Sequence, residues 1–264
     1  MTVDEALRSG GIDAREARLL LAAATGFSEA SVLAFPEKEL AVESAERFLS
    51  FASRRARGEP VAYILGRKEF YGLELTVTPA VLIPRPETEL LVDLALARAP
   101  ASVLDLGTGS GAIALALKRH LPGARVVAAD ASAAALEVAR RNATKLGLDI
   151  ELRHGRWLEA VQGEHFDGIV CNPPYVTVDD PHLAALPFEP RLALLGGADG
   201  LDAIRMVARE APAHLAPGGW LLLEHGAGQH EAVRSLLEAA GLETALGWPD
   251  LAGIPRVAGG RVKS

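Results

Sequence analysis

Four consecutive residues, Asn172, Pro173, Pro174 and Tyr175, have types and an order that could hold an amino group for chemistry. They directly follow residues 167–171, a short apolar run that predicts a buried strand. Each proline fixes φ at about −65° and lacks a backbone N–H, so the turn is stiff and rich in acceptors. The Asn172 side-chain oxygen and nearby backbone carbonyls could accept both hydrogens of one planar NH2 group. The alternative is a strand that simply ends in a turn, because Asn-Pro is a common turn signal.

A glycine-rich loop lies upstream of this turn, between a predicted strand that ends near Asp105 and a predicted helix. Its residues are Gly107, Thr108, Gly109, Ser110 and Gly111. Glycines allow a tight turn and a close approach of the backbone to a ligand. The carboxyl end of the first strand is also where open α/β sheets bind ligands. Asp130 ends the next strand, where a carboxylate can accept hydrogen bonds from two ribose hydroxyls, so the pattern predicts a nucleoside-containing cofactor.

Two classes of cofactor fit this loop. Gly107, Gly109 and Ala112 satisfy the dinucleotide pattern G-x-G-x-x-G/A, which would make the protein a nicotinamide dehydrogenase. The loop also matches the D-L-G-x-G-x-G motif of S-adenosylmethionine-dependent methyltransferases. Asp105 favours the methyltransferase, because a carboxylate suits a cationic methionine amino group and fits poorly beside a pyrophosphate. Trp157 follows the third predicted strand, where its ring could pack against the adenine or could simply belong to the core.

Composition excludes several other classes of protein. The chain has 264 residues, 49% of them hydrophobic, and a net charge of −7, which argues against a general nucleic-acid binder. Cys171 is the single cysteine, so no intramolecular disulfide or multi-cysteine metal cluster can form. No apolar run approaches the roughly 20 residues of a membrane helix, and the acidic start does not resemble a signal peptide. We expect a cytoplasmic protein without a metal.

The elements that must position these residues follow from hydrophobic periodicity. Helices are predicted at 14–25 and 41–57, with Asp13 and Ser28 as N-caps, and a strand hairpin at 68–77. From residue 101, strands and helices alternate, which predicts a mostly parallel, doubly wound α/β sheet. The boundary between the two regions is predicted near residues 75–85. The predicted strands are 103–105, 125–129, 149–153, 169–171, 219–224, 244–248 and 256–262, and the helices between them are 112–120, 133–146, 201–215 and 231–240.

Four further segments carry a resemblance to one family. Residues 58–66, 70–72, 82–89 and 189–201, together with the turn at 172–175, resemble the bacterial peptide-chain release factor glutamine N5-methyltransferases. The resemblance implies a class I methyltransferase fold, with a Rossmann-like, seven-stranded, doubly wound sheet that has one antiparallel strand. It also implies a five-helix substrate-recognition domain at 1–65, a β-hairpin connector at 66–85 and a catalytic domain at 86–264.

The same resemblance implies the reaction. The methyl group of S-adenosyl-L-methionine would pass to the glutamine of the Gly-Gly-Gln loop in class-one release factors, leaving S-adenosyl-L-homocysteine. From the chemistry of the turn itself, we predict that Asn172 and the carbonyl of Pro173 each accept one N–H of the amide and that Tyr175 covers one face of it. Arg85 would lie near the entrance, while Glu189 and Arg191 could support the turn or touch the substrate. We expect a monomer that does not stably bind nucleic acid.

Other functions remain open at this point. An N6-adenine or N2-guanine methyltransferase would flip a base into the same kind of site, because the turn fits any planar NH2 group. A dehydrogenase would leave the turn at 172–175 unexplained. A non-catalytic binding module would have no use for Asn172 and Asp130 together.

Overall fold

The first helices begin and end at residues whose conformations cap them. Asp13 accepts hydrogen bonds from the backbone N–H groups of Arg15 and Glu16 at the start of α2 (Ala14–Thr25). Gly26 ends this helix in the left-handed conformation, and Ser28 caps α3 (Glu29–Ala34). Both predicted N-caps are therefore confirmed. The other helices of this region are α1 (Val3–Ser9), α4 (Val42–Ala56) and α5 (Val61–Leu65).

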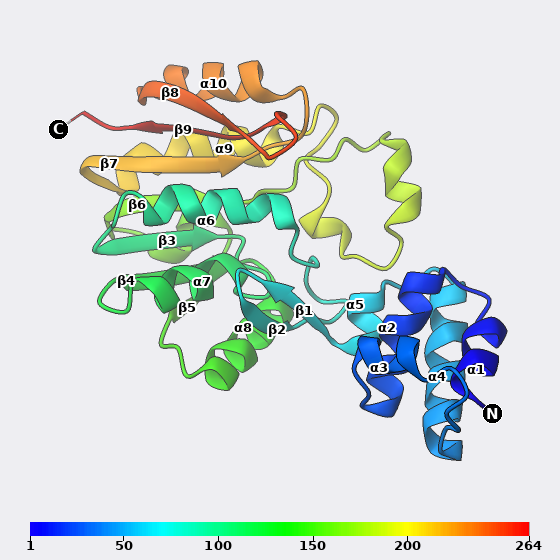
Figure 1. Ribbon diagram of the computed structural model, residues 1–264. Coiled ribbons are helices and arrows are strands. Elements are labelled where there is room, and N and C mark those ends of the chain that lie inside the picture. The colour runs from blue at the N-terminus through cyan, green and yellow to red at the C-terminus, as the bar shows by residue number, and fades with distance from the viewer. Residues whose placement is uncertain (264) are drawn as a thin grey trace. The chain divides into compact units, whose positions relative to one another are not determined.

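The computed structural model describes residues 1–263 (Figure 1). It divides into two compact units, Met1–Arg67 and Lys68–Ser264. The five helices make up the first unit and enclose a core of their own around Leu20, Leu21 and Phe48. Each unit thus has its own hydrophobic core, which is what an independently packed domain requires.

A short hairpin opens the second unit. Its strands are β1 (Arg67–Phe70) and β2 (Leu73–Thr76). Tyr71 and Gly72 join them with φ values of 50° and 73°, the left-handed pair that a two-residue hairpin turn needs. Phe70 and Leu75 of the hairpin are buried in the core of the second unit.

A seven-stranded sheet forms the centre of the second unit, in the order β5-β4-β3-β6-β7-β9-β8. β9 runs antiparallel to both of its neighbours, and the pairs among β3 to β7 are parallel. This confirms the predicted doubly wound sheet with one antiparallel strand. The strands are β3 (Ser102–Leu106), β4 (Arg125–Asp130), β5 (Glu151–His154), β6 (Phe166–Cys171), β7 (Leu215–Glu224), β8 (Glu243–Pro249) and β9 (Pro255–Arg261).

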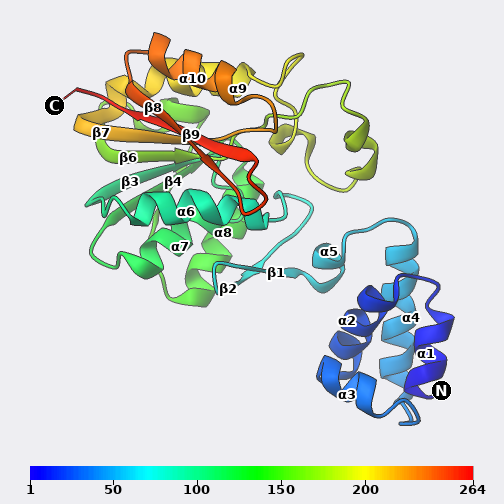
Figure 2. The ribbon, with the colours of Figure 1, turned by 45° about the horizontal axis from the view of Figure 1, so that its top comes forward.

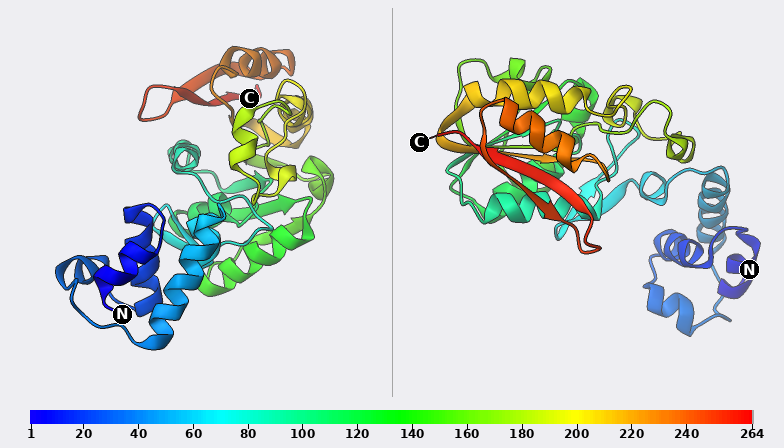
Figure 3. Two further views of the ribbon diagram at one scale, coloured as in Figure 1. Left: turned by 90° about the vertical axis from the view of Figure 1, so that its right-hand side faces the viewer. Right: turned by 90° about the horizontal axis from the view of Figure 1, so that it is seen from above.

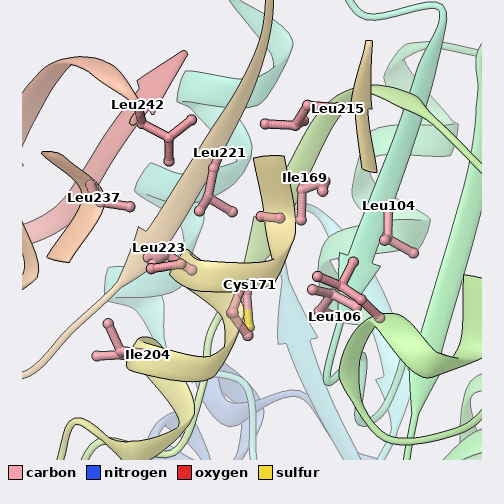
Figure 4. Packing of buried hydrophobic residues seen from close by; sticks show 14 of the residues in the cluster. Leu104, Leu106, Ile169, Cys171, Ile204, Leu215, Leu221, Leu223, Leu237 and Leu242 are labelled. Atoms are coloured by element: carbon pink, nitrogen blue, oxygen red, sulfur yellow. The ribbon is translucent and has the colours of Figure 1, made fainter. Parts of the chain in front are cut away.

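Helices cover both faces of the sheet (Figures 1 and 2). Leu104, Ile169 and Leu221 point to one face, where they pack with side chains of α9 (Asp202–Glu210) and α10 (His230–Ala239). Figure 4 shows this cluster gathered around the strands, with Cys171 and Ile204 among its members. The opposite face packs against α6 (Glu89–Leu96), α7 (Ala112–His120) and α8 (Ala133–Leu146).

The edge of the sheet formed by β8 and β9 lies along α10, which contacts both strands (Figure 3). Within residues 1–263, no helix combines the length and the apolar character needed to cross a membrane. Helices α6 to α10 cover the two faces of the sheet. A ligand site is therefore expected at the carboxyl ends of the parallel strands, where the connecting loops lie.

Candidate active site

The glycine-rich loop joins β3 to α7 at the carboxyl edge of the sheet. The N–H groups of Gly107 and Thr108 both donate to the carbonyl of Ala129 on β4, at 2.9 and 3.0 Å. Gly107, Gly109 and Gly111 have φ values of 72°, 54° and 82°, which any residue with a Cβ would adopt only under strain. The loop is thus fixed to the neighbouring strand in a shape that its glycines permit.

Asp105 lies directly beneath this loop and is fully buried. Its Oδ2 atom accepts hydrogen bonds from the Thr108 hydroxyl at 2.7 Å and from the Ala114 N–H at 3.1 Å. Its Oδ1 atom is buried without a partner in the described part of the chain. Burial, with a smaller contribution from the nearby Asp130, raises the pKa of Asp105 to about 7, although the two hydrogen bonds act to lower it. A buried carboxylate with one free oxygen fits a cationic or N–H donor of a ligand.

Asp130 and Trp157 flank the loop. Asp130 ends β4 and accepts from the N–H groups of Gly109 and Ser132, at 2.9 and 2.8 Å, which fixes its carboxylate beside the loop. Trp157 has a left-handed backbone with φ of 51°. A Cβ on Gly107 would lie 3.8 Å from the Trp157 ring, so the ring stands next to the glycine loop.

A cavity of about 440 Å³ opens among these residues, within the second unit. Its lining includes residues from the ends of β3, β4 and β6 and from the segment before α6. Of the predicted site residues, those that line it are Arg85, Gly107, Thr108, Gly109, Ser110, Asp130, Trp157, Asn172 and Pro174. Asp105, Gly111, Pro173 and Tyr175 are not among the lining residues. The structure therefore brings the glycine loop and the Asn172 turn, 65 positions apart in the sequence, to one cavity.

The Asn172 amide has a fixed orientation at the end of β6. Its Nδ2 atom donates to the hydroxyl of Thr88 at 3.1 Å, and Thr88 itself is buried. Because Nδ2 faces Thr88, the Oδ1 atom on the other side of the amide is left as an acceptor. The preceding residue, Cys171, is buried and its pKa is raised well above its usual value by burial, so it has no nucleophilic character at neutral pH.

Tyr175 anchors the other end of the turn. Its hydroxyl donates to Oε1 of Glu224 at 3.1 Å, and its carbonyl accepts from Nε2 of Gln229 at 3.1 Å. Burial, followed by the nearby Glu224, raises the pKa of Tyr175, so the phenol remains a donor at neutral pH. Its ring packs against the hydrophobic cluster on the α9 side of the sheet.

The turn is part of a longer loop, residues 172–201, and the later part of this loop folds back along the turn. Val176 pairs with Leu195 in a parallel bridge. A Cβ on Gly196 would lie 2.6 Å from the carbonyl oxygen of Pro174, and one on Gly200 would lie 2.3 Å from that of Tyr175. Only glycine allows the backbone at positions 196 and 200 to approach the turn so closely, which explains why Gly196 and Gly200 occur in this segment.

An ion pair connects this loop to the segment before α6. Arg85 Nη2 lies 2.5 Å from Glu189 Oε1, and Glu189 Oε2 accepts from the Ile83 N–H at 3.1 Å. Glu189 is buried, so it supports the loop, which was one of the two roles open for it. Arg191 is exposed and does not line the cavity.

Several residues at the site escape sequence reasoning. Asn142 of α8 is fully buried and donates to the carbonyls of Ser110 and Thr76, at 2.9 and 3.0 Å, so it supports the glycine loop from behind. Thr88, Glu224 and Gln229 support the Asn172 turn. Two signals in the sequence could have indicated these residues. Asn142 is a polar residue inside an amphipathic helix, and Glu224 is a carboxylate that ends an apolar strand.

Comparisons with known proteins agree with this geometry. The family model described as a PrmC N-terminal domain matches residues 3–66, and the methyltransferase small domain matches residues 86–186. Among solved structures, a methyltransferase from Pyrococcus furiosus shares 20% identity with a TM-score of 0.59, covering 80% of this chain and 98% of its own. A 16S rRNA N2 methyltransferase from T. thermophilus, in complex with AdoMet and guanosine, shares 23% identity with a TM-score of 0.54, covering 75% of this chain and 50% of its own. These structures share the methyltransferase fold.

Curated relatives are similar over almost the whole chain. The release factor glutamine methyltransferase of Xylella fastidiosa is 50% identical over 257 residues, which cover 95% of this chain and 94% of the relative. That of Burkholderia pseudomallei is 48% identical over 274 residues, covering 99% and 96%. With the fold, the glycine loop and the Asn172 turn in place, the chain belongs to the release factor glutamine methyltransferase family.

Proposed function

We propose that this protein methylates N5 of the glutamine in the Gly-Gly-Gln loop of bacterial class-one release factors, and so modulates translation termination. The observation that carries the proposal is the Asn172 amide, held by Thr88 at a cavity that the glycine loop also lines. The names of relatives that match nearly the full length support the release factor as the substrate.

The residues around the glycine loop fit S-adenosyl-L-methionine, which supplies an electrophilic sulfonium methyl group when bound. Asp105 is buried beneath the loop and does not line the cavity, so its carboxylate would attract the methionine ammonium group through its charge. The Asp130 carboxylate would accept from the ribose hydroxyls, and the Trp157 ring would pack against the adenine. The backbone of residues 107–111 would allow the close approach that these contacts need.

The Asn172 turn would prepare the substrate amide. An amide nitrogen is a poor nucleophile because its lone pair is delocalised into the carbonyl. Asn172 Oδ1 and the Pro173 carbonyl would each accept one N–H, which aims the nitrogen and favours its rehybridisation. Holding two reactants in the right geometry can supply up to about 7–11 kcal/mol of a barrier. No side chain of the turn is a base, so the proton released after transfer would leave to water.

The two units would divide the work between partner and chemistry. The predicted substrate-recognition domain at 1–65 would bind the release factor, the hairpin region at 66–85 would connect it, and residues 86–264 would carry catalysis. We further propose that the enzyme acts as a cytoplasmic monomer and does not stably bind nucleic acid. The identities of 44–50% to release factor enzymes do not favour the nucleic-acid methyltransferase alternative.

The direct test is to incubate the protein with methyl-labelled S-adenosylmethionine and a purified release factor, and to map the label by mass spectrometry. We expect one methyl group on the glutamine of the Gly-Gly-Gln loop. A release factor with that glutamine replaced by alanine is the control and should take up no label. Label in added DNA or RNA, with none on the release factor, would overturn the proposal.

A further inference from the structure

A glutamine that does not line the cavity connects three segments beside the Asn172 turn. Gln229 directly precedes α10 and is half-buried, and its side chain does not cap that helix. Its Nε2 atom donates to the carbonyls of Tyr175 and Asp199, at 3.1 and 3.3 Å, and its Oε1 atom accepts from the Gly226 N–H at 2.8 Å. The amide thus uses both of its hydrogens and its oxygen on backbone groups, which gives it one fixed orientation.

The backbone next to this amide leaves no room for another side chain. A Cβ on Gly200 would lie 2.4 Å from Gln229 Nε2, and one on Gly226 would lie 3.0 Å from Gln229 Oε1. Atoms at such separations repel, so a side chain at either position would push the amide away. Glycine at both positions therefore lets the Gln229 amide reach between the turn and the segments beside it.

The two prolines make the turn stiff, so it moves as one body. Each proline fixes its own φ and restrains the residue before it. Such a segment, attached to β6 at one end, can still tilt unless its far end is held. The far end is the peptide group after Tyr175, whose carbonyl accepts from Gln229 and whose N–H donates to the Leu194 carbonyl at 2.9 Å. Gln229 therefore supplies a hydrogen bond that sets the tilt of the turn.

We infer that Gln229 is a positioning residue, because by holding the Tyr175 carbonyl it keeps the Asn172 turn at the tilt from which both acceptors reach the substrate amide. The inference rests on the proposed function, in which Asn172 Oδ1 and the Pro173 carbonyl each accept one N–H. Thr88 fixes the side chain of Asn172, but a backbone carbonyl is aimed only by the chain that carries it. Gln229 would thus aim the acceptor that Thr88 does not hold.

Two substitutions remove the donor and keep the length of the side chain. Gln229→Met has no hydrogen to donate and no strong acceptor. Gln229→Glu keeps an acceptor for the Gly226 N–H, but its ionised carboxylate faces the Tyr175 carbonyl without a hydrogen to give. We expect each to lower kcat for release factor methylation by roughly tenfold to a hundredfold, because a misplacement of about 1 Å can cost about 10² in rate. A residue that only filled space would tolerate glutamate.

The separate kinetic constants distinguish positioning from a merely structural role. The Kd for S-adenosylmethionine should stay within about threefold, because the Gln229 amide bonds to segments other than the glycine loop, and this retained binding also shows that each variant is folded. KM for the release factor should also stay within about threefold, because the proposed partner-binding domain is the first unit. Parallel loss of kcat and donor binding would assign Gln229 to the scaffold and overturn the inference.

The chain offers a matched control at its other glutamine. Gln162 is exposed and does not line the cavity. Gln162→Met and Gln162→Glu make the same chemical changes there and should leave kcat unchanged. Equal losses at both glutamines would show that the Gln229 effect does not come from its place beside the turn, and the inference would be wrong.

A double-substitution cycle tests whether Gln229 acts through the turn. With Asn172→Ala already present, Gln229→Met should cost less in kcat than it does alone, because the two acceptors hold one NH2 group and act as a unit. Losses that multiply in full would overturn the inference, as would wild-type turnover in both Gln229 variants. Hydrogen exchange at the Val176 N–H should be faster in Gln229→Met, and this readout needs no substrate. A wild-type enzyme that leaves the release factor glutamine unmethylated would instead overturn the proposed function, so the two failures are distinguishable.

Discussion

Asn172 is the residue on which the proposed chemistry depends most directly, because its amide is both fixed and next to the cavity. We expect Asn172→Ala to lower kcat by about 10²–10³, the usual effect of removing one preorganised hydrogen-bonding group. The Kd for S-adenosylmethionine should change little, because the donor contacts lie on the glycine loop. Single-turnover kinetics and calorimetric titration would measure the two quantities. Turnover near wild type would show that Asn172 does not hold the substrate.

Asp105 should make the affinity for the methyl donor depend on pH. Burial raises the pKa of this carboxyl to about 7, so it is mostly neutral in mildly acidic solution. Its ionised form attracts an ammonium group better, so we expect the donor Kd to fall between about pH 5.5 and about pH 7, before the donor's own α-amino group titrates near 7.7–8.0. Asp105→Asn should bind more weakly with a flat profile. An equally steep profile in Asp105→Asn would assign the titration to another group.

The same carboxyl predicts an opposite trend in the stability of the ligand-free protein. Its pKa in the folded state lies above its usual value of 3.8. Its stabilising contribution is therefore complete below about pH 4 and is lost as the pH rises through about 7. Urea unfolding should show the free energy of unfolding of the wild type falling, relative to Asp105→Asn, between about pH 4 and about pH 7. Glu224, with a pKa also raised to about 7, is present in both proteins and cancels in the comparison.

At the scale of elements, α8 supports the cofactor loop through Asn142. Its buried side chain makes three hydrogen bonds: it donates to the carbonyls of Ser110 and Thr76 and accepts from the Thr76 N–H. Asn142→Ala leaves these groups unpaired at about 1–3 kcal/mol each, so we expect a loss of roughly 3 kcal/mol or more of stability, together with weaker donor binding. Chemical unfolding would measure it. Arg141→Ala, on the exposed side of the same helix, is the control and should cost at most about 1 kcal/mol.

The loop at 172–201 depends on the ion pair that joins it to the segment before α6. Glu189→Ala would leave the Arg85 guanidinium and the Ile83 N–H without their partner. We expect faster hydrogen exchange across residues 172–201 and no change in the first unit. Glu189→Gln, which keeps an acceptor for Ile83, should show an intermediate effect. Unchanged exchange in Glu189→Ala would mean that the bridge at Val176 and Leu195 suffices to order the loop.

Local signals in the sequence predicted many element boundaries well. The predicted helices 112–120 and 133–146 are observed with those bounds as α7 and α8. The predicted helix 201–215 ends early, because Pro212 lacks an N–H and the chain changes to a 3₁₀ turn at Ala211–His214. β7 therefore begins at Leu215 and is longer than the predicted 219–224. Periodicity locates an element, while proline chemistry and strand pairing decide where it ends.

The candidate site was predictable only where its residues are contiguous. The loop at 107–111 and the turn at 172–175 each carry their signal within a few positions. The hydrogen bond from Asn172 to Thr88 spans 84 positions, and that from Thr76 to Asn142 spans 66. Such pairs form only because the strand order places β3, β4, β6 and β7 side by side. Without that order, no local pattern indicates which polar residue meets which.

At the scale of the whole molecule, the division into two units with separate cores predicts that partner binding and donor binding can be altered separately. Leu33 and Phe35, at the end of α3, are 62% and 51% exposed in the first unit. Contiguous exposed apolar surface marks protein-binding sites, and we expect these two side chains, two positions apart in the sequence, to contribute to one.

We therefore expect the double variant Leu33→Ser and Phe35→Ser to raise KM for the release factor by roughly tenfold, which corresponds to a loss of about 1.4 kcal/mol from the two side chains together. The donor Kd should not change, because the glycine loop and its supports all belong to the second unit. Leu251→Ser is the matched control, as Leu251 is equally apolar and fully exposed between β8 and β9. Steady-state kinetics with intact release factor would measure KM. If Leu251→Ser raised KM while the double variant did not, recognition of the partner would belong to the catalytic unit.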